Sequence, residues 1–317
     1  MSFWKNKRVL VTGGTGFLGK QIVSILENRG AEVFSPRSKD YDLTKIEDAV
    51  KYMEEKKPQI VIHSAAFYGG LGINATQPGK IYYTNLVMGA NVMEAARIVN
   101  VEKFITIGTA CSYPGYLEGD LNENDLWAGP VHDSVAHYGL TKKIMQTQGI
   151  AYKKQYNLNS IHLILTNLYG PGDSYNPDRS HVVAALIRKF SEAKLEKKGE
   201  IEVWGTGKPI REFMHVKACA EAIIIAAEKY NSLEALNIGT GIGTTIKELV
   251  ESITKITNFK GKVIWNTDKP DGQYKKILDV SKLKNEVGWK NTIPLNQGLE
   301  ETISWYMENK EEADKKW

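Results

Sequence analysis

Short apolar runs alternate with longer amphipathic patterns through the first half of the chain. Runs rich in apolar and β-branched residues predict strands at 8–12, 31–35, 59–63, 103–107 and 160–165. Between them, Ile22, Leu26 and the stretch 46–53 have helical spacing, and Pro58 predicts a helix stop before the third strand. Strands alternating with helices are typical of βαβ units, so we expect an α/β fold with a parallel sheet.

The pattern changes after about residue 165. A loop is expected at 170–179 and a charged surface connector at 194–199. The remaining pattern predicts helices at 182–193, 216–227 and 246–256 and a strand at 235–238. We expect two units that share the chain: one formed by 1–165, to which roughly 213–240 returns, and one formed mainly by 166–317. No fixed-period repeat is visible, and low complexity is confined to the charged tail at 309–316.

Composition changes this picture little. With 317 residues, 42% of them hydrophobic and 25% charged, the chain is typical of a globular protein of about two units. The 41 basic and 37 acidic residues give a net charge of +4, with no basic footprint for nucleic acid and no apolar run long enough for a membrane. Two cysteines, Cys111 and Cys219, form no disulfide framework, which favours a cytoplasmic location.

A glycine-rich loop follows the first predicted strand and opens a helix. In Thr12-Gly-Gly-Thr-Gly-Phe-Leu-Gly19, the spaced glycines are Gly13, Gly16 and Gly19. One makes a tight turn, one lets a pyrophosphate approach the backbone, and one lets the helix pack on the strand. The pyrophosphate then meets the unpaired N–H groups and dipole of the helix N-terminus. This placement predicts a dinucleotide site in a Rossmann-type, doubly wound sheet.

The end of the second predicted strand indicates which dinucleotide is used. An NAD site usually has an acidic side chain here for the ribose 2′-hydroxyl. This chain instead has Ser35 followed by a segment containing Arg37, which favours the 2′-phosphate of NADPH, although a polar surface loop is the alternative. Asp42 and Leu43 lie where such folds flank the adenine, but a cap before Thr44 explains Asp42 equally well.

A tyrosine and a lysine four residues apart, Tyr138 and Lys142, share one face of a predicted helix. A nearby ammonium lowers the pKa of a tyrosine, so Tyr138 is a candidate proton donor or acceptor. The spacing alone carries little information, because it recurs at three other places, Tyr41–Lys45, Tyr52–Lys56 and Tyr306–Lys310. Tyr138 differs in lying downstream of the fourth strand, whose end carries Thr109 as a candidate hydrogen-bond donor to the same substrate oxygen.

These motifs together resemble the extended short-chain dehydrogenases/reductases. The second half of the chain narrows the resemblance to the GDP-L-fucose synthase family, through the segments 166–171, 180–183, 203–207, 211–216, 237–241, 269–272 and 276–280. The resemblance implies a Rossmann-type sheet with a smaller α/β cap that binds a sugar nucleotide. It also implies epimerisation of GDP-4-keto-6-deoxy-D-mannose at C3 and C5, followed by NADPH-dependent reduction at C4 to give GDP-L-fucose.

The resemblance assigns residues to each step. It implies Cys111 and His181 as the acid/base pair of epimerisation, with Thr109, Tyr138 and Lys142 serving the reduction, while Cys219 and His63 are read as packing residues. The implied cofactor contacts are Gly13, Thr15, Gly16, Phe17, Leu18, Gly19, Arg37, Asp42, Leu43, Ala65, Ala66, Tyr138, Lys142, Asn167 and Leu168. The implied substrate contacts are Asn167, His181, Lys189, Trp204, Arg211 and Lys269. No metal site is expected.

Departures from the family pattern leave other functions open. His137 and Leu165 stand where the family has proline, and the glycine loop lacks an arginine common in the family. The alternatives are a reductase or epimerase of another nucleotide-linked 4-keto sugar, such as a GDP-keto-heptose, an NAD-retaining UDP-sugar 4-epimerase, and a non-catalytic NADP(H)-binding regulator. A homodimer is expected from the resemblance alone.

Overall fold

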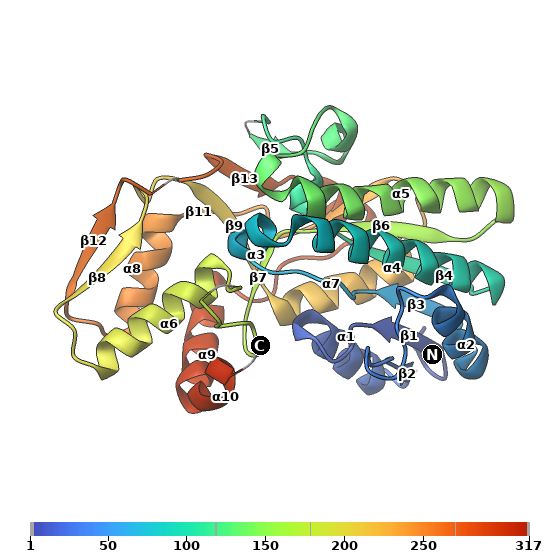
Figure 1. The fold of residues 1–317 in the computed structure, drawn as a ribbon, viewed down its shortest axis with the longest axis horizontal. Coiled ribbons are helices and arrows are strands. Elements are labelled where there is room, and N and C mark those ends of the chain that lie inside the picture. The colour runs from blue at the N-terminus through green and yellow to red at the C-terminus, as the bar shows by residue number, and fades with distance from the viewer. Residues whose placement is uncertain (1–2, 118, 178, 270, 316–317) are drawn as a thin grey trace.

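A six-stranded parallel sheet forms the centre of one half of the molecule (Figure 1). The computed structural model describes residues 3–117, 119–177, 179–269 and 271–315. The strand order is β2-β1-β3-β4-β6-β10, and every pairing is parallel. The strands are β1 (Arg8–Thr12), β2 (Glu32–Phe34), β3 (Ile60–His63), β4 (Lys103–Thr109), β6 (Ser160–Leu165) and β10 (Ala235–Ile238). The predicted Rossmann-type α/β fold is confirmed.

Helices cover both faces of this sheet. On one face lie α1 (Phe17–Asn28) and α7 (Val216–Lys229), and on the other lie α2 (Ile46–Lys56), α4 (Pro78–Ile98) and α5 (Ala136–Tyr156), with the short α3 (Leu71–Thr76) before α4. Because both faces are covered, β3, β6 and β10 are buried at every position, which is why apolar residues predominate in them. The predicted stop at Pro58 is confirmed, since α2 ends at Lys56 and Lys57 turns the chain with a φ of 45°.

The rest of the chain builds a second region beside the sheet. Its strands are β5 (Asp120–Leu121), β7 (Asn167–Tyr169), β8 (Glu200–Trp204), β9 (Ile210–His215), β11 (Gly243–Thr245), β12 (Lys262–Asn266) and β13 (Lys275–Leu278). They form one sheet in the order β11-β9-β13-β5, with β7 paired to β9, and a second from β8 and β12. Its helices are α6 (Val182–Leu195), α8 (Ile246–Thr257), α9 (Leu295–Glu308) and α10 (Lys310–Lys315).

Short helical turns complete the chain. They are η1 (Ala110–Ser112), η2 (Glu123–Trp127), η3 (Asp133–Val135) and η4 (Leu283–Val287). Among the described residues, no helix has the length and apolar character needed to cross a membrane. The division of the chain near residue 165 stays a prediction, although β10 does join the first sheet beside β6.

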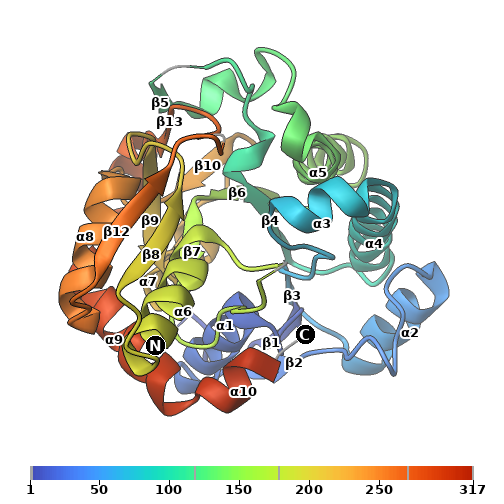
Figure 2. The ribbon, with the colours of Figure 1, turned by 60° about the vertical axis from the view of Figure 1, so that its left-hand side comes forward.

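The strand order places the functional edge of the molecule. Strand β1 lies between β2 and β3, so the sheet changes winding direction there. Open parallel sheets bind ligands outside the carboxyl ends of the strands at such a switch point. Figure 2 shows the chain between β7 and α6 crossing towards the segment before α3 at this end, and the N–H of Gly70 donates to the carbonyl of Arg179 across the gap at 2.9 Å.

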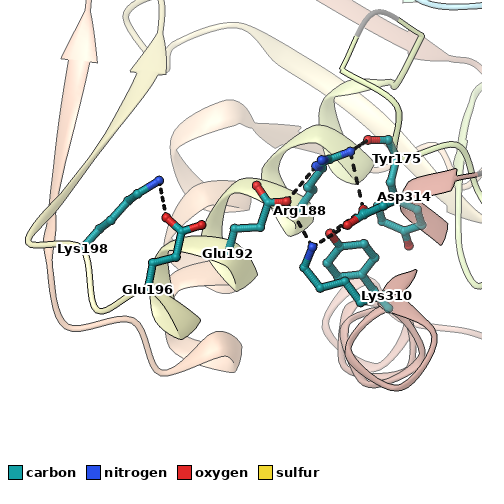
Figure 3. Close-up of polar contacts among 8 residues, drawn as sticks. Tyr175, Arg188, Glu192, Glu196, Lys198, Lys310 and Asp314 are labelled. Carbon is teal, nitrogen blue, oxygen red and sulfur yellow. Dashed lines mark hydrogen bonds and ion pairs between the residues drawn. The ribbon is translucent and has the colours of Figure 1, made fainter. Parts of the chain in front are cut away.

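The C-terminal segment is an ordered helix rather than a bare charged tail. In Figure 3, Asp314 of α10 lies against Arg188 of α6, and their charged atoms are 3.5 Å apart. Lys310 approaches Glu192 of α6 at 3.3 Å and also pairs with Asp314. Arg188 additionally donates to the carbonyl of Tyr175 at 3.0 Å. These contacts fasten α10 to α6 and to the loop that leads into α6.

A buried carboxylate joins the two regions. Glu212 of β9 is fully buried, and its carboxylate accepts hydrogen bonds from the N–H groups of Thr240 and Gly241, which follow β10, and of Leu278 on β13. Its own carbonyl accepts from the side chains of Thr166 and Asn167, which follow β6. Burial raises the pKa of Glu212, while the N–H groups that donate to its carboxylate favour the charged form. One residue therefore holds the ends of β6 and β10 against β9 and β13.

Replacing Glu212 with glutamine is expected to lower the free energy of unfolding by about 2 kcal/mol or more, because an amide NH₂ would replace one of the two accepting oxygens and leave the backbone N–H on that side unsatisfied. Urea unfolding followed by circular dichroism measures this. The matched control is Glu200→Gln on the exposed start of β8, for which we expect a change within about 0.5 kcal/mol. Equal stability of the two variants would contradict the role of Glu212.

Candidate active site

The glycine loop between β1 and α1 is built by close backbone approach. Gly13 has a φ of 69°, and a Cβ there would lie 2.9 Å from the backbone of Ala65. A Cβ on Gly19 would overlap the carbonyl of Gly13, so the helix could not sit as close to the loop. Gly16 is the N-cap of α1. Gly14, to which the sequence analysis gave no role, packs against the Ser35 side chain with no room for a Cβ.

The N-terminus of α1 is open to an anion. It has no side-chain cap and no acidic residue in its first turn, so its first N–H groups are left for a ligand. Thr15 lies exposed on the loop, Phe17 is partly buried, and Leu18 packs on the core beneath. These features fit the pyrophosphate of a dinucleotide.

The segment after β2 carries two exposed basic side chains. Arg37 and Lys39 are exposed just after β2. Asp42 closes a turn before α2 rather than capping the helix, whose N-cap is Lys45. Its carboxylate accepts from the N–H and hydroxyl of Thr44 at 3.0 and 2.6 Å, which lowers the pKa of Asp42. Leu43 packs against the core formed with α2 and α4. The residues present therefore fit a 2′-phosphate better than a bare ribose hydroxyl.

The end of β3 is tied to β1 and to α5. The N–H of Ala65 donates to the Thr12 hydroxyl at 3.1 Å, and this hydroxyl also lies 2.8 Å from Nδ1 of His63. Lys142 reaches the carbonyl of Ala65 at 3.5 Å, whereas Ala66 is exposed. Burial lowers the pKa of His63 well below its usual value. His63 is thus a neutral packing residue beside the loop.

Tyr138 and Lys142 are both buried on α5 beside the end of β4. The helix comes so close to η1 that a Cβ on Gly139 would overlap the carbonyl of Cys111, and the Ser112 hydroxyl donates to the carbonyl of Gly139 at 2.9 Å. This close packing is what brings Tyr138 next to Cys111.

The expected lowering of the pKa of Tyr138 is wrong for the protein alone. Burial raises the pKa of Tyr138, and the Cys111 thiol raises it further. Burial also lowers the pKa of Lys142 to about 8, so the ammonium is itself disfavoured here. The i, i+4 spacing predicts only the attraction between the phenolate and the ammonium. Burial also removes both groups from water, which disfavours the charged form of each.

The tyrosines of the three other tyrosine–lysine pairs make structural contacts. Tyr41 donates to Glu55 at 2.9 Å and packs edge-to-face on Tyr52, and Lys56 lies over the Tyr52 ring. Tyr306 and Lys310 both bind Asp314 in the network that fastens α10. Position in the fold therefore separates the pair of interest from these copies.

Cys111 lies in the turn that begins at Thr109. The N–H of Cys111 donates to the Thr109 hydroxyl at 3.2 Å, so Thr109 caps η1 and yet keeps its own O–H for a ligand. The ammonium of Lys276 on β13 lies 3.6 Å from Sγ of Cys111. Cys219, by contrast, is fully buried in α7, where burial raises the pKa of its thiol.

His181 is the N-cap of α6, and its ring stacks on Tyr68, with the centroids 5.0 Å apart. The other side of the contact is Tyr138, whose ring centroid lies 4.7 Å from that of Tyr68. Burial lowers the pKa of His181 to about 4, which keeps the imidazole neutral and able to accept a proton. The structure thus brings Cys111, Tyr138 and His181 together around Tyr68.

The residues expected at the nucleotide half of a substrate lie on the second region. Trp204 ends β8 with 62% of its surface exposed, and the ammonium of Lys269 lies 5.3 Å from the centre of its ring. An exposed tryptophan is not the core residue that composition alone would suggest. Burial lowers the pKa of Arg211, which donates to the carbonyl of Ile210 at 2.9 Å. Trp204 and Lys269 are therefore accessible to a ligand.

The other expected ligand residues make local contacts. Lys189, exposed on α6, donates to the carbonyl of Glu202 at 2.8 Å. Asn167 on β7 donates to the carbonyl of Glu212 at 3.0 Å, and Leu168 packs on the core. Lys189 is thus close to the strand that carries Trp204, whereas the amide of Asn167 serves the join between the two regions.

Sequence reasoning missed three contributors. The fold brings Tyr68 to Tyr138 and His181, and it brings Lys276 to Cys111. Neither Tyr68 nor Lys276 belongs to a spacing pattern that would identify it from the sequence. Asp271 accepts from the N–H and hydroxyl of Thr206 at 2.7 and 2.6 Å, and so holds the turn after Trp204. Asp271 lies in the segment 269–272, whose resemblance to the GDP-L-fucose synthase family was the available signal.

One cavity among the described residues lies apart from the candidate site. A cavity of about 440 Å³ sits under α8 and β12, lined by Lys247, Val250, Phe259 and Trp265 among others, and contains none of the candidate residues. Within 3–117, 119–177, 179–269 and 271–315, no group of three or more His, Cys, Asp or Glu side chains is placed to hold a metal ion.

The model of the NAD dependent epimerase/dehydratase family matches residues 9–239. The chain belongs to this family. It is 38% identical over 307 residues to the probable GDP-L-fucose synthase 1 of Oryza sativa subsp. japonica, covering 96% of this chain and 93% of the relative. The predicted resemblance to the GDP-L-fucose synthase family of extended short-chain dehydrogenases/reductases is confirmed.

Solved structures agree. A GDP-L-fucose synthetase from Naegleria fowleri bound to NADP is 27% identical with a TM-score of 0.89, covering 98% of this chain and 97% of that one. A GDP-6-OMe-4-keto-L-xylo-heptose reductase from C. jejuni is 28% identical with a TM-score of 0.90, covering 96% of this chain and 98% of that one. Similarity over nearly the whole length extends the family assignment to the second region.

Replacing Gly139 with alanine is expected to push α5 away from η1, because its Cβ would overlap the carbonyl of Cys111. Overpacking of this kind costs about 1–3 kcal/mol in the free energy of unfolding, measured by urea denaturation. The control is Gly79→Ala on α4, where a Cβ would have nothing within 4 Å. If both variants were as stable as the parent, the close packing would not hold Tyr138 in place.

Proposed function

We propose that this protein is an NADPH-dependent epimerase–reductase that converts GDP-4-keto-6-deoxy-D-mannose to GDP-L-fucose. The observation that carries the proposal is the gathering of Cys111, Tyr138 and His181 around one ring, that of Tyr68. A reduction alone needs one proton donor, whereas epimerisation needs two further acid/base groups on opposite faces of the sugar. The named function of the curated relatives supports the same reaction.

The first half-reaction exchanges protons next to the ketone. A proton on carbon next to a carbonyl is acidic, because the electron pair left behind delocalises onto the oxygen. One of the pair Cys111 and His181 removes the proton at C3 or C5, and the other returns one to the opposite face. The enolate oxygen at C4 accepts hydrogen bonds from Tyr138 and Thr109. The ammonium of Lys276 contacts Sγ of Cys111 at 3.6 Å.

The second half-reaction reduces the ketone. Bound NADPH supplies the hydride that adds to C4. Tyr138 gives its phenolic proton to the oxygen, and its buried position keeps this proton in place until the alkoxide develops. Lys142 would bind the ribose of the nicotinamide. Its positive charge would also stabilise the phenolate that Tyr138 becomes when it gives up its proton.

The cofactor rests on residues of the first sheet. Gly13, Gly16 and the open N-terminus of α1 suit the pyrophosphate, and Arg37 suits the 2′-phosphate. The NADP-bound structural relative supports this choice. For the GDP end of the substrate we infer that Trp204 packs on the base and that Lys189, Arg211 and Lys269 neutralise charge.

A second candidate is the reduction of another GDP-linked 4-keto sugar, and the similarity to the heptose reductase favours it. We also infer a homodimer in which α4 and α5 pack against their copies, because Tyr83, Leu140 and Ile144 expose apolar surface on these helices. Analytical ultracentrifugation tests the dimer.

The experiment that tests the function uses NADPH and GDP-4-keto-6-deoxymannose in deuterated water. NADPH oxidation with deuterium at C3 and C5 of the product supports the full reaction. Oxidation without deuterium would reject epimerisation, and turnover of a GDP-keto-heptose in place of this sugar would reject the fucose assignment and retain the mechanism.

Lys276→Gln is expected to slow deuterium exchange at C3 and C5 by about tenfold or more, because the Cys111 side chain would lose the cation that lies 3.6 Å from its sulfur. Single-turnover exchange followed by NMR measures this. Lys275→Gln is the matched control, since Lys275 pairs with Asp120 at 2.8 Å, and it should leave exchange within about twofold. Equal exchange in the two variants would remove Lys276 from the mechanism.

The affinity for NADPH is expected to fall about tenfold as the pH rises through about 8, because the pKa of Lys142 lies there and only its charged form can donate strongly to the ribose. Calorimetric titrations between about pH 6.5 and pH 9.5 measure this. Arg37 stays charged throughout and cannot produce the change. In Lys142→Arg the pH dependence should disappear, and its persistence there would assign it to another group.

A further inference from the structure

The loop that carries Tyr68 is fixed on both sides. The amide of Asn85, buried on α4, donates to the carbonyl of Phe67 at 2.9 Å and accepts from its N–H at 2.8 Å. On the other side, the N–H of Gly70 donates to the carbonyl of Arg179 at 2.9 Å. The backbone around Tyr68 is therefore held both to α4 and to the segment that leads to His181.

The side chain of Tyr68 lies between two groups of the proposed mechanism. Its ring centroid is 4.7 Å from that of Tyr138, at 34° between the planes, and 5.0 Å from that of His181, at 22°. Even so, 42% of the residue surface remains exposed, so Tyr68 lies at an accessible part of the site.

His181 depends on this contact more than Tyr138 does. Tyr138 is also held by the close approach of α5 to η1 and by packing against Ile73 and Ile81. Nε2 of His181 is buried and has no hydrogen-bond partner among the described residues, so the stacked face of Tyr68 is its visible support. An imidazole without a hydrogen-bonded orienting group relies on packing for its direction.

We propose that Tyr68 is a positioning residue that orients His181 for epimerisation and so makes epimerisation precede reduction. The proposal rests on the proposed function. The base can act on the sugar only while its ring is aimed at the carbon that loses the proton. When the base is misdirected, Tyr138 and NADPH can still reduce the C4 ketone, and the product is the alcohol that has not been epimerised.

The first test measures the two half-reactions separately. Tyr68→Leu, which removes the ring, is expected to lower deuterium exchange per NADPH oxidised by at least tenfold and to release un-epimerised alcohol, with reduction within threefold of the parent. Tyr68→Phe keeps the ring and should match the parent within twofold. Tyr116→Leu, on a residue 60% exposed in the loop after η1, is the control for loss of an exposed tyrosine. A parallel fall in both half-reactions, or no change in their ratio, would overturn the proposal.

The second test needs no substrate. NMR of the histidine rings, with His181→Asn used for assignment, follows the titration of His181 in the protein alone. The pKa of His181 is lowered to about 4 by burial. In Tyr68→Leu it should move at least one pH unit towards its ordinary value, because the stacked ring no longer excludes water, and in Tyr68→Phe it should not.

An unchanged titration in Tyr68→Leu would overturn the positioning role whatever the substrate. A parent protein that neither oxidises NADPH nor exchanges deuterium with the GDP-keto sugar would reject the proposed function. The NMR titration would still decide whether Tyr68 supports His181.

Discussion

The buried carboxylate of Glu212 is the interaction on which the arrangement of the two regions depends. This carboxylate accepts hydrogen bonds from the chain after β10 and from β13. The backbone carbonyl of Glu212 accepts from the chain after β6. The ligand edge of the six-stranded sheet is thereby held against the second region. Because β13 carries Lys276 and β9 carries Arg211, the same join sets the position of Lys276 beside Cys111 and of Arg211 beside the turn of Asp271.

Close packing does the equivalent work within the first region. Gly139 lets α5 approach η1 until Tyr138 and Cys111 share one environment, and Gly13 and Gly19 let the loop after β1 fold beneath α1. Glycine is required at these positions because a Cβ would meet backbone atoms, which cannot move aside as a flexible side chain can. The proposed chemistry therefore rests on backbone-to-backbone distances as much as on the reactive side chains.

Burial gives the reacting groups protonation states that their spacing did not predict. Desolvation raises the pKa of Tyr138, lowers that of Lys142 to about 8 and lowers that of His181 to about 4. A phenol that keeps its proton and an imidazole that stays neutral suit a proton donor and a base, respectively. The i, i+4 argument from sequence had the sign of the Tyr138 effect wrong, because desolvation outweighs a cation whose own charge is disfavoured.

The sequence by itself determined the strands of the first sheet and the ligand edge. Hydrophobic periodicity marks β1, β3, β4 and β6, and the glycine loop marks the dinucleotide end, because both signals are local and lie within a few residues. Tertiary structure alone decided which distant residues meet: Lys276 with Cys111, Tyr68 with His181, and Glu212 with the turns after β10 and at β13. Such pairs lie far apart along the chain, so no local pattern carries them. Burial likewise fixes the pKa values only after the chain has folded.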